Sequence, residues 1–108
     1  MAKSPDESLV KLDLNNPTFQ KNWLSLEKPE RERVTSALAK LLKLTWNDVY
    51  KDPGLKWEKI VSVKPPADIT ALYSVRITQS RRATAYRDGD FMRFLTIQQD
   101  HASTYGRK

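Results

Sequence analysis

The sequence predicts an α+β domain with an N-terminal strand, two helices and then a three- to four-stranded antiparallel sheet, with the helices packed on one sheet face. Three observations favour this fold class. An apolar stripe at helical spacing lies in the first half of the chain, strict alternation marks residues 72–78, and an Asp88-Gly89 turn signal separates two further strand-like segments. The length of 108 residues suits one domain with a modest core.

The N-terminal part is expected to hold a leader, a strand and a first helix. Residues 1–8 are polar and are expected to be a flexible leader, whereas residues 9–14 alternate as a short strand does. Asn16 is a candidate N-cap and Pro17 suits the first helical position. A helix of two or three turns should therefore follow Asn16.

A second helix is expected to restart at Lys28-Pro29-Glu30, with acidic residues in its first turn. It carries the clearest helical stripe of the chain, formed by Val34, Ala37, Leu38, Leu41 and Leu42. Residues 46–50 are expected to extend or follow this helix, and Asp52-Pro53-Gly54 should end it.

The second half reads as strands. Residues 57–63 suggest a strand that Pro65-Pro66 closes, and from Leu72 onward the residues Tyr73, Val75 and Ile77 share one sheet face. Residues 83–87 and 91–98 flank Asp88-Gly89, which predicts a hairpin with a two-residue turn. This register would place Tyr86 opposite Phe91, Thr84 opposite Arg93 and Arg82 opposite Leu95. Both hairpin faces are partly apolar, so periodicity leaves the buried face open.

Composition narrows the function classes. The net charge is +6, which favours polyanionic or acidic partners. The absence of Cys excludes disulfides and thiolate metal sites, and a single His is too few for a His-based zinc site. No apolar run approaches the length of a membrane span and the N-terminus lacks the apolar core of a signal peptide, so the expected location is cytoplasmic.

Arginine is concentrated in the last third of the chain. Residues 72–108 carry six Arg and one Lys against three Asp, whereas residues 1–71 carry two Arg and ten Lys against ten acidic residues. The planar guanidinium suits bidentate contact with phosphate. The C-terminal third is therefore a candidate polyanion-binding surface, although solvated or ion-paired arginines would give the same composition.

A few of these residues suit phosphodiester cleavage, which needs cations at the phosphoryl oxygens, a base and an acid. Arg76 and either Arg81 or Arg82 fit the first need, because adjacent residues on a strand point to opposite faces and only one of the two joins Arg76. His101 and Tyr105 are candidates for proton transfer. The alternative is that His101 is a surface residue and Tyr105 docks on the sheet.

Four segments in the second half form a familiar order: Leu55–Ile60, Leu72–Ile77, Arg82–Asp90 and Asp100–Tyr105. In this order they resemble the RelE/ParE superfamily, the small basic toxins of bacterial type II toxin–antitoxin systems. The resemblance covers most of the chain in element order and residues 55–105 in motif. It implies a RelE-like fold and a single toxin domain over residues 9–108.

For the larger branch of that superfamily, the resemblance implies metal-independent cleavage of mRNA at the ribosome by the message's own 2′-hydroxyl. Arg76 and Arg82 would then hold the scissile phosphate, His101 would be general acid or base, and Tyr105 would stack on a base or assist proton transfer. Further RNA contacts are expected from Arg81, Arg93 and Ser74.

Two other functions fit the same residues. Toxins of the ParE branch share the fold and inhibit DNA gyrase without nuclease residues, and a basic nucleic-acid-binding module would need no catalysis. For a RelE-like enzyme, the implied partners are a cognate antitoxin protein, mRNA and the ribosome, with no membrane and no cofactor.

Overall fold

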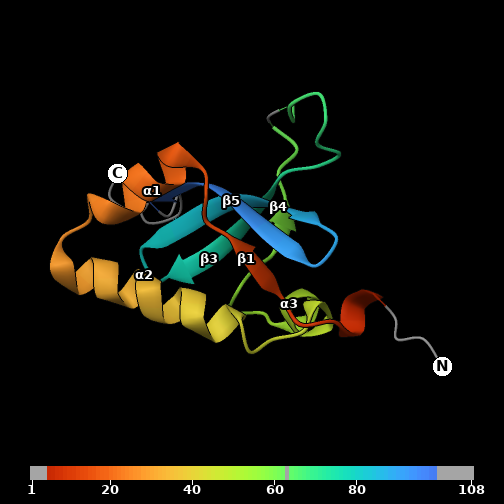
Figure 1. The fold of residues 1–108 in the computed structure, drawn as a ribbon, viewed down its shortest axis with the longest axis horizontal. Coiled ribbons are helices and arrows are strands. Elements are labelled where there is room, and N and C mark those ends of the chain that lie inside the picture. Colours follow the sequence, from red (N-terminus) through yellow and green to blue (C-terminus); the bar gives the residue numbers. More distant parts are fainter. Residues whose placement is uncertain (1–4, 63, 100–108) are drawn as a thin grey trace.

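The computed structural model describes residues 5–62 and 64–99, which form a five-stranded sheet with helices on one of its faces (Figure 1). The strands are β1 (Lys11–Asp13), β2 (Glu58–Lys59), β3 (Tyr73–Thr78), β4 (Arg81–Asp88) and β5 (Phe91–Gln99). The helices are the 3-10 helix η1 (Pro5–Glu7), α1 (Pro17–Leu24), α2 (Lys28–Leu41) and α3 (Trp46–Lys51). Within the described residues, no helix has the length and apolar character needed to cross a membrane.

The sheet has the order β1-β5-β4-β3-β2. Strands β2 to β5 are antiparallel neighbours, as the sequence predicts. β1 pairs parallel with β5, with Leu12 opposite Met92, so the complete sheet is mixed rather than antiparallel. The long connection through helices and strands between β1 and β5 permits this parallel arrangement. Within residues 57–62 of the strand expected over residues 57–63, only the two residues of β2 form a strand.

The first two helices lie where the sequence predicts them. Asn16 caps α1, because its side-chain oxygen accepts hydrogen bonds from the backbone N–H groups of Thr18 and Phe19. In α2 the stripe packs inward, although Leu42 lies just beyond the last turn and is half exposed.

The sequence predicts two α-helices, and the structure has a third one. Residues 46–51 form a separate helix, α3, which Thr45 caps at its N-terminus. The hydroxyl of Thr45 accepts from the backbone of Asp48, and the Asp48 carboxylate accepts from the backbone of Thr45. This capping box gives α3 its own start, so residues 46–50 do not extend α2.

Part of the expected leader has structure. Pro5–Glu7 form η1, and the Asp6 carboxylate lies 2.7 Å from a guanidinium nitrogen of Arg87. The chain entering β1 is therefore attached to the end of β4 by an ion pair.

The core lies between the helices and one face of the sheet. The largest fully buried side chains are Trp46 and Phe19 from the helices and Phe94 from β5. Phe19 packs against Phe94 with ring centroids 5.1 Å apart. Val75, Ile77, Ala83 and Ala85 complete the buried sheet face. This confirms that the helices cover the face bearing Val75 and Ile77, and it identifies the Ala83–Ala85 face of the hairpin as the buried one.

The hairpin register differs from the prediction. Asp88 pairs with Phe91, so the turn residues are Gly89 and Asp90, and Gly89 has a φ of 62°. A bulge between Thr84 and Ala85 then shifts the pairing again, which places Arg82 opposite Gln98 and Thr84 opposite Thr96. Asp88 continues the strand because Gly89 at the first turn position supplies the positive φ by itself.

Candidate functional site

The sheet face opposite the helices brings two arginines together. Arg76 on β3 lies directly opposite Arg82 on β4, and Ser74 lies opposite Thr84 one pair further along. Their neighbours Val75 and Ala83 are in the core, so alternation directs Arg76 and Arg82 to the other face. Like charges directly opposite on neighbouring strands repel each other. An anion bound between them would relieve that repulsion.

Arg82 is held in a fixed position. Its Nε donates a hydrogen bond of 2.5 Å to the Ser74 hydroxyl, and one terminal nitrogen donates to the Lys56 carbonyl at 3.1 Å. The side chain is only 14% exposed. A guanidinium with this much support loses little conformational entropy when it contacts a phosphate.

Glu58 joins this group, and sequence reasoning did not single it out. It pairs with Ser74 across β2 and β3, and its carboxylate lies 3.9 Å from Arg82. The Glu58 side chain is 67% exposed, so it is accessible to a ligand. Only the register of the two-residue strand β2 reveals this proximity, because nothing in the local sequence distinguishes Glu58 from other surface carboxylates.

The segment before β2 is bent toward the arginine pair. The Leu55 carbonyl accepts from the backbone N–H of Arg76 at 2.7 Å, and Lys56 adopts a φ of 49°. A positive φ is uncommon for a residue with a side chain and costs conformational energy. The hydrogen bonds from Arg76 and Arg82 hold this bend, which places Lys56 beside the site.

Arg81 belongs to a different group. Its Nε lies 3.3 Å from the Glu30 carboxylate on α2, to which the hydroxyls of Thr78 and Ser80 also donate at 3.0 Å. Of the two adjacent arginines, Arg82 therefore lies with Arg76 and Arg81 is directed to the helix side. Burial by itself raises the pKa of Glu30. The hydrogen bonds from Ser80 and the surrounding donors lower it by a larger amount, so the pKa lies below its ordinary value.

Arg93, which is expected from the sequence to contact RNA, forms ion pairs with two carboxylates. It lies on the same face as Arg82 but pairs with Asp13 at 2.5 Å and with Asp88 at 2.9 Å, and its guanidinium lies over the Phe91 ring. These contacts raise the pKa of Arg93, chiefly through the hydrogen bond to Asp13. Arg93 therefore joins β1 to the hairpin, which is a structural role.

Arg87 is also bound internally. It pairs with Asp6, donates to the Tyr50 hydroxyl at 2.8 Å and lies 4.4 Å from the centre of the Trp46 ring. The interpretation of Arg87 as part of a charged turn is thus incomplete, because its partners come from η1 and α3. His101 and Tyr105 lie outside the described residues, so their proposed catalytic roles stay predictions.

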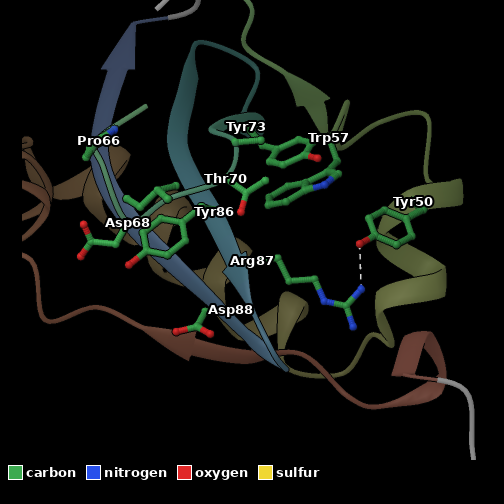
Figure 2. A pocket seen from close by; sticks show the side chains of 11 residues that line it. Tyr50, Trp57, Pro66, Asp68, Thr70, Tyr73, Tyr86, Arg87 and Asp88 are labelled. Atoms are coloured by element: carbon green, nitrogen blue, oxygen red, sulfur yellow. Dashed lines mark hydrogen bonds between the residues drawn. The ribbon is translucent and has the colours of Figure 1, made fainter. Parts of the chain in front are cut away.

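A cavity of about 510 Å³ lies at the end of β4. Figure 2 shows Tyr50, Trp57, Tyr73, Tyr86 and Arg87 around it. Trp57 stacks on Tyr73 with ring centroids 4.6 Å apart and an angle of 7°. Sequence reasoning missed this cavity, because the loop that closes it has no periodic signal.

Potential metal ligands do not gather in the described part of the chain. Over residues 5–62 and 64–99, no group of three or more His, Cys, Asp or Glu side chains could hold a metal ion.

Comparison with solved structures relates this arrangement to a known fold. The chain is similar to the YoeB dimer from Staphylococcus aureus, with a TM-score of 0.50 and 14% sequence identity, over 87% of this chain and 100% of that chain. YoeB is a toxin of the RelE superfamily. The fold is RelE-like. At 14% identity, the likeness to this structure shows the fold and nothing more.

The sequence by itself gives no match in two other comparisons. No protein-family model matches it, and no curated protein matches it. The RelE-like fold therefore rests on the tertiary structure.

Proposed function

We propose that this chain is the toxin of a type II toxin–antitoxin pair and that it cleaves mRNA at the ribosome. One observation carries the proposal: Arg76 and Arg82 lie opposite each other on the open face of a RelE-like sheet, with Ser74 and Glu58 beside them. Two guanidinium groups next to an exposed carboxylate are suited to a phosphodiester, because the cations bind the phosphate and the carboxylate can take a proton.

The proposed reaction uses the 2′-hydroxyl of the message. Glu58 accepts the proton as the 2′-oxygen bonds to phosphorus, and Arg76 and Arg82 neutralise the charge that develops on the phosphoryl oxygens. The bond from phosphorus to the 5′-oxygen then breaks, and His101 or Tyr105 supplies the proton to that oxygen. The products are a 2′,3′-cyclic phosphate and a 5′-hydroxyl end.

The position of Glu58 supports its role as the base. Its carboxylate lies 3.9 Å from Arg82, so a phosphate bound by Arg82 would bring the adjacent ribose close to Glu58. This assignment leaves His101 or Tyr105 as the candidate acid, because one group must take a proton and another must give one.

The proposed setting follows from the charge of this face. A cytosolic antitoxin would inhibit the enzyme by covering Arg76 and Arg82, with acidic or backbone acceptor groups in place of the phosphate. The ribosome would present the message as an unpaired strand, which a sheet face with cationic side chains can bind.

The test is cleavage of a defined mRNA on programmed ribosomes, with the new 5′ ends mapped by primer extension. We expect the natural chain to cut the ribosome-bound message and Arg82→Ala to lose most of this activity. Arg33→Ala is the matched control, because Arg33 is an exposed arginine of α2. Intact mRNA with the natural chain, or equal cutting by Arg82→Ala, would contradict the proposal.

The same purified chain can be tested for the alternative function, inhibition of DNA gyrase. Gyrase-dependent breaks in supercoiled DNA, with mRNA left intact, would assign the chain to the ParE type of activity.

A further inference from the structure

The cavity at the end of β4 is formed by an offset between β3 and β4. β3 begins at Tyr73, which pairs with Ala85, so Tyr86, Arg87 and Asp88 continue β4 beyond the end of its neighbour. Residues 66–71 pass this exposed edge and line the cavity. Its volume of about 510 Å³ lies within the range of small-ligand sites, which is roughly 300–1,000 Å³.

The aromatic walls of this cavity are fixed by internal contacts. Trp57 is stacked on Tyr73 and meets Trp46 edge-on, with centroids 5.4 Å apart. The hydroxyl of Tyr50 accepts a hydrogen bond from Arg87. Tyr86 lines the cavity from β4 without being fully buried (Figure 2). These contacts hold the aromatic walls in place before a ligand enters.

Two carboxylates also line the cavity. Asp88 is exposed and uses one oxygen to accept from Arg93, whereas Asp68 is exposed and has no hydrogen-bond partner within the described part of the chain. Ionised carboxylates only accept hydrogen bonds. The cavity therefore suits a flat ligand that presents N–H donors, and it disfavours a phosphate.

We infer that this cavity is a subsite for an unpaired RNA base that carries an amino group, with guanine as the best fit. Guanine presents an imino N–H and an amino group side by side, which match the two oxygens of one carboxylate, while uracil presents a single N–H. The aromatic rings provide the stacking that RNA-binding sites use for unpaired bases. This inference rests on the proposed function, since it assigns a base preference to the same enzyme.

The cavity and the arginine pair are linked by β4. Tyr86 on the cavity wall and Arg82 lie on the same face of β4, opposite the helices, because the intervening Ala83 and Ala85 are buried. One RNA strand lying along this face can thus place a phosphate at Arg82 and a base in the cavity. A guanidinium or ammonium group from a protein partner would also meet the carboxylates, but Arg87 already places one cation on the wall. A neutral base avoids that repulsion.

The test is binding of two uncleavable 2′-O-methyl hexanucleotides, one of uridine only and one with a single guanosine, measured by fluorescence anisotropy. We expect the natural chain to bind the guanosine-containing strand about fivefold or more tightly, as a carboxylate-to-base pair provides. Asp68→Asn should abolish most of this preference, because its amide presents a donor to the base. Tyr86→Leu should lower the affinity for both oligonucleotides, because it removes a surface on which a base can stack.

Glu32→Gln is the matched control, since Glu32 is an exposed carboxylate of α2 remote from the cavity. An unchanged preference in folded Asp68→Asn, or no preference in the natural chain, would overturn the subsite. Tighter binding of arginine amide than of the guanosine-containing strand would overturn it in favour of a cationic protein ligand. Because binding is measured without cleavage, a preserved guanosine preference in a chain that leaves mRNA intact would reject the proposed nuclease and keep the subsite.

Discussion

Arg76 and Arg82 lie directly opposite each other on neighbouring strands, and both point away from the helices. Arg82 is also hydrogen-bonded to Ser74 and to the Lys56 carbonyl, so its guanidinium is held in place. Like charges directly opposite on neighbouring strands repel each other, and an anion bound between them lowers that repulsion. We therefore expect this position of the sheet to favour a phosphate.

The salt dependence of RNA binding should show whether Arg76 and Arg82 contact phosphate. We expect the affinity for an uncleavable oligonucleotide to fall linearly on a log–log plot against salt concentration, because bound cations release counterions from the strand. Removing Arg82 as Arg82→Ala should reduce the slope by about 0.7, the value for one contact on a single strand. Arg33→Ala should leave the slope unchanged, and a salt-independent affinity of the natural chain would argue against phosphate contact.

Glu58 is predicted to be needed for cleavage and not for binding. Glu58→Gln keeps the shape of the side chain but cannot accept the 2′-hydroxyl proton, so we expect the single-turnover rate to fall about 10²–10⁴-fold. The affinity for an uncleavable strand should change little. Glu32→Gln controls for the loss of a surface charge. Retention of the full rate by Glu58→Gln would assign the base to another group.

The Glu30 cluster should make stability depend on acid. The pKa of Glu30 in the folded chain is below its ordinary value of 4.5, so its contribution is fully present above about pH 4.5 and is lost as the pH falls through the folded pKa. Glu30→Gln should lower the free energy of unfolding by about 1.5–3 kcal/mol at pH 7, because hydrogen bonds to a charged, largely buried group are lost.

This difference should shrink below pH 4.5 in urea unfolding curves measured across the pH range. Glu32→Gln, in the exposed part of the same helix, should show little effect at any pH. A constant difference between the natural chain and Glu30→Gln down to pH 3 would show that the carboxylate charge contributes nothing.

Gly89 should tolerate only residues that accept a left-handed backbone. Its φ is 62° and a methyl group there would meet no atom within 4 Å, so the cost of Gly89→Ala is conformational and about 1 kcal/mol. Gly89→Asn should recover part of this loss, because Asn enters the left-handed region more readily. Thermal unfolding of the three chains provides the comparison. Equal stability of the Ala and Asn variants would contradict this account.

Local patterns were sufficient where the physical cause is local. The Asn16 cap, the buried residues of α2 and the two faces of β3 follow from capping chemistry and from helical or strand periodicity, and the structure confirms them. The separate start of α3 was also encoded locally, in the Thr45 and Asp48 capping box, but the apolar residues before and after it obscure the boundary. In the hairpin, Gly89 takes the first turn position and Asp90 the second. The pairing of β4 with β5 therefore differs from the register that a turn at Asp88-Gly89 would give.

The sequence by itself determined a basic α+β domain, its main elements and a short set of candidate arginines. Only the tertiary structure decided that Arg82 lies with Arg76, that Arg81 is bound by Glu30 and that Arg93 is bound by Asp13 and Asp88. It also decided that Glu58 lies beside Arg82 and that an aromatic cavity lies at the end of β4. The physical reason is that a guanidinium selects its partner by proximity across strands and helices, and residues distant in the chain set that proximity.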